Sequence, residues 1–65
     1  MKLFDIVRMT QDVPALGLCK GMVGAIVDVF GEPAEAYEVE FTDGQGRTIA
    51  QAALPPEMIE LLAQT

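Results

Sequence analysis

Met-Val-Gly-Ala-Ile-Val-Asp-Val-Phe, at residues 22–30, is the strongest run of β-branched and apolar residues in the chain. Such a run predicts a strand that is apolar on both faces except at Asp28. Gly24, near the start of this run, predicts either a bend or bulge that lets the strand serve two sheets or a close approach of another backbone. The phase of the run places Val23, Val27 and Val29 inward and Ile26, Asp28 and Phe30 outward, and a bulge near Gly24 would reverse that phase.

The clearest alternation in the sequence lies at residues 36–41. Successive side chains of a strand point to opposite faces, so Tyr37, Val39 and Phe41 share one face and Glu38 and Glu40 share the other. The segment therefore predicts a strand with one buried and one solvated face.

Other segments complete a strand series. Residues 3–9 predict a first strand, and residues 10–21 predict a long loop that folds back onto the sheet. A turn at 31–35 and the Asp-Gly turn at 43–46 flank the strand described above, and the second turn leads into a strand at 47–54. Pro55 and Pro56 then end that strand, and the apolar segment after them is either a short helix or a 3₁₀ turn entering a fifth strand.

These elements predict an all-β fold, a small antiparallel barrel of four to five strands with a short C-terminal helical turn. The chain has 65 residues, which allows one domain over residues 1–65. A domain this small buries only about 60% of its unfolded surface, so we expect its stability to be marginal.

Self-association is the expected source of additional stability. A single cysteine cannot close an intramolecular disulfide, and a chain with no histidine and one cysteine lacks the ligands of a structural zinc site. The hydrophobic content of 51% exceeds what one small core holds. We therefore expect a homodimer, with Ile26 and Phe30 as the best candidates for its interface.

The charge balance restricts the partners. Four Lys and Arg against ten Asp and Glu give a net charge of −6, which repels both nucleic acid and an anionic membrane surface. Asp5 falls where a signal peptide would be cationic or apolar, and acidic or basic residues interrupt every candidate membrane span. We expect a cytoplasmic protein with Cys19 reduced.

A family resemblance rests on the segment from Lys20 to Val29, in which glycines three residues apart lead into an apolar strand. This segment resembles the KOW-type segment of SH3-like barrels. Together with residues 3–7, 36–41 and 43–48, the chain resembles a family of small bacterial proteins classed as a domain of unknown function. The resemblance implies an SH3-like barrel without an assigned enzymatic activity, sometimes encoded beside toxin-like genes, and implies no catalytic residues.

Two groups of residues have the chemistry of a possible site. Glu38 and Glu40, with Asp28 on the neighbouring strand, could bind a divalent cation, but carboxylates that alternate outward on a sheet favour a solvated face. Cys19 lies beside Lys20, yet the chain has no histidine to serve as its base. We therefore expect Cys19 to be a small residue buried under the loop.

Two other patterns resemble parts of nucleotide-binding sites. Gly17, Gly21 and Gly24 lack the helix and the Lys-Ser/Thr pair of a phosphate-binding loop. Tyr37 and Phe41 could stack on bases, but their strand presents glutamates instead of basic residues, so core packing is favoured.

The sequence thus favours a non-enzymatic protein-interaction module without cofactor, metal or catalytic residues. Its alternatives are an antitoxin or immunity-type protein that masks a basic toxin surface, and an accessory subunit of a larger enzyme. The expected contact surface uses the loop at 10–21 and the edges beside the 22–41 hairpin. Its candidate residues are Leu16, Leu18, Ile26, Asp28, Phe30, Glu38 and Glu40.

Overall fold

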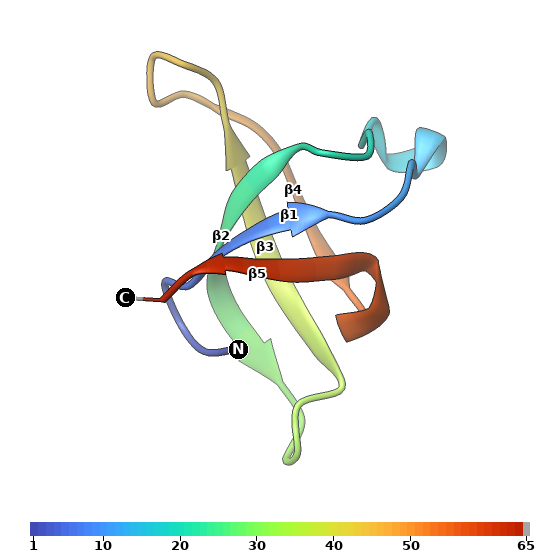
Figure 1. Ribbon diagram of the computed structural model, residues 1–65, viewed down its shortest axis with the longest axis vertical. Coiled ribbons are helices and arrows are strands. Elements are labelled where there is room, and N and C mark those ends of the chain that lie inside the picture. Colours follow the sequence, from blue (N-terminus) through green and yellow to red (C-terminus); the bar gives the residue numbers. More distant parts are fainter. Residues whose placement is uncertain (65) are drawn as a thin grey trace.

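The computed structural model describes residues 1–64 of the chain, and its elements follow one another as a series of antiparallel strands (Figure 1). The strands are β1 (Ile6–Met9), β2 (Val23–Phe30), β3 (Ala36–Thr42), β4 (Thr48–Leu54) and β5 (Ile59–Ala63). Two short 3₁₀ turns, η1 (Pro14–Leu16) and η2 (Pro56–Met58), interrupt the series. The predicted all-β class is confirmed, and the segment after Pro55 is a 3₁₀ turn followed by a fifth strand.

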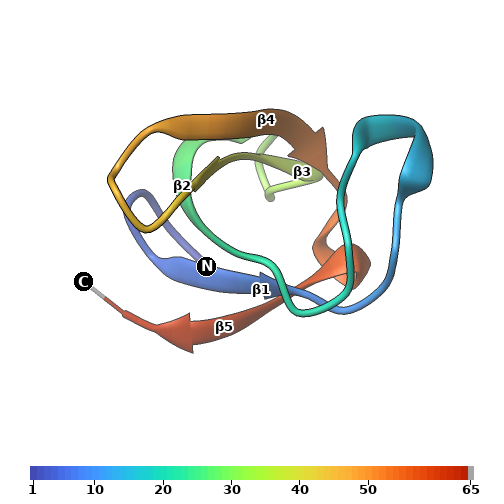
Figure 2. The same ribbon diagram turned by 90° about the horizontal axis from the view of Figure 1, so that it is seen from above.

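The strands form one sheet in the order β4-β3-β2-β1-β5. The sheet is curled, with β4 on one side and β1 and β5 on the opposite side (Figure 2). In the described part of the chain β4 and β5 are the two ends of the strand order, so the curled sheet stays open. The expected barrel closure, which would have removed both edges, is therefore replaced by a sheet with two edge strands.

The core lies inside the curl. Tyr37, Val39 and Phe41 are buried, while Glu38 and Glu40 lie on the outer face, as the alternation predicts. Residues from the other four strands and from the β1–β2 loop complete the buried cluster: Val7, Met9, Leu18, Ile26, Leu54 and Ile59.

Strand β2 changes its phase at Val27. Its pairing with β3 is regular from Gly24 to Ile26, and a register shift then separates Ile26, opposite Val39, from Asp28, opposite Glu38. An extra residue in one strand exchanges the inward and outward positions after it. Ile26 therefore faces the core at 0% exposure, whereas Phe30 faces outward at 42%.

This bulge corrects the sequence-based facing of the strand. Val23 was expected inside and is 47% exposed, while Ile26 was expected outside and is in the core. After the bulge the expectation holds, because Val29 packs against the core and Asp28 is exposed. Of the two explanations offered for Gly24, the structure supports the close approach of another backbone, that of β3, and places the bulge at Val27.

The turn between β3 and β4 is organised by Asp43. Its carboxylate accepts hydrogen bonds from the backbone N–H groups of Arg47, at 3.0 Å, and Gln45, at 2.8 Å. These bonds lower the pKa of the Asp43 carboxyl below its ordinary value because they stabilise the charged form, and the bond from Arg47 has the larger effect. The Asp-Gly turn predicted at 43–46 is thus confirmed, with an Asx-type cap holding it.

No helix in residues 1–64 is long and apolar enough to cross a membrane.

Candidate interaction site

The outer face of the two central strands carries the predicted acidic cluster. Asp28 on β2 is the direct partner of Glu38 on β3, and Glu40 lies two residues further along β3 on the same face. The amide Nε2 of Gln51, on β4, donates a hydrogen bond of 2.9 Å to Oε2 of Glu38. The three carboxylates are therefore brought to one face, as expected.

This cluster does not form a metal site in the described residues. Within residues 1–64, no group of three or more Asp, Glu, Cys or His side chains is arranged to hold a metal ion. The carboxylate of Asp28 is engaged locally, because its Oδ1 accepts a 2.8 Å hydrogen bond from the backbone N–H of Val29. The arrangement is an acidic face of the sheet, whose negative potential disfavours the approach of anions.

The basic residues are poorly placed to bind nucleic acid. Arg8 is ion-paired with Glu60, and Arg47 is ion-paired with Asp43 at 2.8 Å. Half of the four basic residues of the chain are therefore already neutralised by a neighbouring carboxylate. Binding to nucleic acid at physiological salt needs several cations on one surface.

We therefore expect no measurable affinity for DNA or RNA at about 150 mM salt. Fluorescence anisotropy with a labelled DNA duplex and a labelled single-stranded RNA checks this. The same titration at low salt shows whether any weak binding is purely electrostatic. A low-micromolar dissociation constant at physiological salt would contradict the expectation.

The long loop places its two predicted leucines differently. Val13 and Leu18 form an isolated bridge, with N···O distances of 2.8 and 3.1 Å, that folds the loop back as expected. Leu18 is thereby buried at 1% exposure, whereas Leu16 on η1 is 49% exposed. Leu16 remains a surface residue, but Leu18 and Ile26 belong to the core and offer no surface to a partner.

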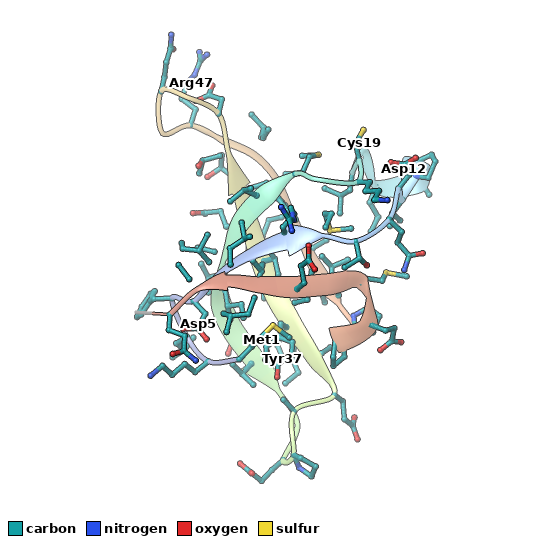
Figure 3. All side chains as sticks on the ribbon, viewed as in Figure 1. Met1, Asp5, Asp12, Cys19, Tyr37 and Arg47 are labelled. Atoms are coloured by element: carbon teal, nitrogen blue, oxygen red, sulfur yellow. The ribbon has the colours of Figure 1, made fainter. Side chains whose placement is uncertain are left out.

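Cys19 also differs from expectation, because it is exposed on the same loop (Figure 3). Its backbone N–H donates to Sδ of Met22 at 3.1 Å, which ties the loop to the start of β2 while the thiol points outward. The buried residue under this loop is Leu18, its immediate neighbour. The expectation had assigned the buried position to the wrong member of the pair.

A shallow hollow of about 330 Å³ lies over the end of β1. It is lined by Arg8, Met9, Thr10, Lys20, Gly21 and Glu60. Nε of Arg8 donates to Oε1 of Glu60 at 2.6 Å, so these two charges compensate each other. Lys20 adds a cation, but Asp12 lies beside it and accepts its backbone N–H at 2.7 Å. The hollow is therefore close to neutral and gives no strong preference for a charged ligand.

A second region with exposed apolar side chains is the end of the sheet where β1 begins and β5 ends. The pairing of Ile6 with Ala63 brings these two chain ends together, and both lie toward the same end of the sheet (Figures 1 and 2). We call this region the apolar end. Its large side chains are between 40% and 62% exposed: Leu3, Phe4, Leu61 and Leu62.

Phe4 is the most exposed side chain of the apolar end, at 62%. Its φ of 70° lies in the left-handed region, which a residue with a large side chain rarely adopts. Its backbone N–H donates to the carbonyl oxygen of Ile26 at 2.7 Å, and this bond fixes the turn ahead of β1. This turn therefore places the aromatic ring of Phe4 in solvent and holds its backbone in a conformation that is unfavourable for phenylalanine.

The match to a family model covers residues 3–61, which include β1 to β4 and the first part of β5. That model describes a domain of unknown function, DUF4926. The chain belongs to the DUF4926 family. No curated protein and no solved structure gave a significant match.

Sequence patterns did not indicate the apolar end of this DUF4926 chain. The run at 3–9 was interpreted as one strand, but β1 starts at Ile6, so Leu3 and Phe4 precede it. Leu61 and Leu62 were assigned to an apolar segment after Pro56 without a facing, and β5 is an edge strand with only Ile59 buried. The one available signal was Asp5, an acidic residue that interrupts the apolar run.

Proposed function

We propose that this DUF4926 chain is a non-enzymatic, cytoplasmic protein-interaction module that binds a protein partner through the apolar end. The observation that carries the proposal is Phe4, an aromatic residue 62% exposed at a φ of 70°. A left-handed backbone costs about 1–2 kcal/mol for a residue with a side chain. Neither core burial nor backbone preference accounts for phenylalanine here, whereas a partner that covers the ring does.

The neighbours of Phe4 suit such a contact. Leu3, Leu61 and Leu62 are each at least 40% exposed and belong to the chain segments near the joined ends of β1 and β5. An apolar centre with a large aromatic residue is the usual composition of an energetically important contact.

The SH3-like description of the fold is part of this proposal. It is supported by the antiparallel meander of β1 to β4 and by β5, which follows η2 and pairs with β1.

The variant Phe4→Asn tests this proposal. Asparagine tolerates the left-handed region, so the free energy of unfolding is expected to stay unchanged or to rise by up to about 1 kcal/mol. Binding to the partner is expected to be lost, because the ring is gone. The immobilised protein is used to capture partners from an extract of its native cell, and chemical denaturation measures stability in parallel.

Leu16→Asn is the matched control, because Leu16 is 49% exposed on η1, outside the apolar end. A partner that wild type and Leu16→Asn retain and Phe4→Asn loses supports the proposal. Equal capture by all three proteins would show that the apolar end is not the contact surface.

The acidic cluster supports a second candidate, an antitoxin or immunity-type protein that masks a basic surface. Asp28, Glu38 and Glu40 share one face of a chain with a net charge of −6. Such a contact is electrostatic, so salt is expected to weaken it strongly. A partner released by moderate salt and lost with Glu38→Gln and Glu40→Gln, but not with Phe4→Asn, would favour this candidate.

A further inference from the structure

Strand β4 is an edge strand that lacks the usual protection against pairing. It is at one end of the strand order, so only one of its two edges is paired, and it lies along one outer side of the curled sheet (Figure 2). Its seven residues, Thr48–Leu54, include no charged residue and no proline. Edge strands of monomeric proteins are ordinarily blunted by lysine, proline, inward-pointing charges or short length.

We propose that the free edge of β4 pairs antiparallel with the β4 of a second copy, which gives a symmetric dimer. Antiparallel pairing of one strand with itself is a two-fold contact, so it closes at two copies. The two sheets then continue as one through their backbone hydrogen bonds. This inference goes beyond the proposed function, which concerns a different surface and does not depend on it.

Backbone regularity favours β4 over β5. The pairing of β4 with β3 shifts between Phe41 and Thr42, near the start of the strand, and is regular over Ala50–Leu54. The pairing of β5 with β1 shifts in its middle and leaves a regular stretch of only three residues, Ile59–Leu61. β5 also carries Glu60, whereas the regular part of β4 is uncharged. A second strand therefore finds a longer and flatter edge at β4.

Charge distribution favours a second copy as the occupant. Two chains of net charge −6 repel each other over most contacts, but an uncharged edge lets them approach. The nearest carboxylates, Glu38 and Glu40, are on β3, and the two β3 strands of the dimer would be about 14 Å apart at three strand spacings. That separation exceeds the Debye length of about 8 Å at physiological salt, so their repulsion is largely screened.

The ends of the strand are complementary as well. Antiparallel pairing about the middle of β4 directs Arg47 of one copy toward η2 of the other, which carries Glu57. The side chain of Arg47 is 74% exposed, and Glu57 is also exposed. Although Arg47 pairs with Asp43 in its own turn, its exposed guanidinium retains donors for a second carboxylate.

Sedimentation equilibrium at tens of micromolar, with two matched lysine variants, tests the proposal. Ala52 lies on the inner face of β4, opposite Val39, and Ala53 lies on the outer face of the same strand, opposite Glu38. A lysine at Ala52 reaches solvent past a free edge but is trapped in a paired one, whereas a lysine at Ala53 stays in solvent in both states. Ala52→Lys is expected to raise the dimer dissociation constant about tenfold or more, and Ala53→Lys to leave it nearly unchanged.

Hydrogen exchange of the wild-type protein gives a second measurement that needs no variant. Alternate backbone N–H groups of β4 face the free edge, and we expect their exchange to slow as protein concentration rises. A wild-type monomer throughout, exchange in Ala50–Leu54 that does not depend on concentration, or a dimer that Ala52→Lys leaves intact would each overturn the proposal. Oligomers larger than a dimer would also overturn the proposal, because they would indicate head-to-tail pairing instead of a symmetric dimer.

Discussion

Gly24→Val is expected to lower the free energy of unfolding by about 3 kcal/mol or more, whereas Ala25→Val changes it by less than about 1 kcal/mol. A Cβ atom on Gly24 would lie 2.7 Å from the carbonyl oxygen of Glu40, 2.8 Å from Cγ1 of Val39 and 2.9 Å from Cδ1 of Phe41. The first of these is backbone in the central strand β3, which cannot move without breaking the ladder. A valine at this position therefore forces β2 and β3 apart.

The neighbouring position makes a sharp comparison. Ala25 is partly exposed on the outer face, opposite Ile6 of β1 and Glu40 of β3, and a β-branched side chain there favours the strand. Urea denaturation of both variants measures the difference, and Gly24→Ala is the intermediate control because its only added atom is the Cβ. Equal midpoints for Gly24→Val and Ala25→Val would show that the close approach at Gly24 does not constrain the fold.

The sequence predicts strand β2 itself but not which of its residues face the core. Glycine in a strand indicates a bulge or a close approach, and the pattern alone cannot distinguish the two. The bulge occurs instead at Val27, a β-branched apolar residue that carries no bulge signal. Because one extra residue exchanges the faces of the strand, the facing of Ile26 could not be predicted, although the strand itself could.

Strand β3 was predictable for the opposite reason. Its glutamates alternate with apolar residues, so only one orientation buries Tyr37, Val39 and Phe41 without burying charge. The same argument placed Glu38 and Glu40 on the outer face, and this part of the candidate site followed from the sequence alone.

The N-terminal turn was not predictable from hydropathy. Asp5 is 1% exposed, and one carboxylate oxygen accepts a 2.9 Å hydrogen bond from the backbone N–H of Lys2. The usual relation between polarity and exposure is inverted here, because the acidic Asp5 is buried and the aromatic Phe4 beside it is exposed to solvent. The apolar end follows from this inversion, which depends on a local backbone hydrogen bond that composition does not encode.

Ile26→Lys is expected to unfold the protein, with a loss of about 3–5 kcal/mol or more, while Phe30→Lys costs less than about 1 kcal/mol. Both residues were candidates for one dimer interface when the strand was taken to be regular. The bulge at Val27 separates them: Ile26 is 0% exposed, and Phe30 is 42% exposed. A lysine at position 26 would bring an unpaired charge into the core, whereas a lysine at position 30 extends into water.

Circular dichroism and urea denaturation distinguish this from an interface effect. If Ile26 were an interface residue, Ile26→Lys would yield a folded monomer with wild-type secondary structure. Because it is a core residue, we expect loss of the β signal at every protein concentration, and Ile26→Ala should fall between wild type and the lysine variant, with a cost of about 2–5 kcal/mol. A well-folded Ile26→Lys protein would restore Ile26 to the surface and would place the bulge elsewhere in β2, since only a shift of the register turns this side chain outward.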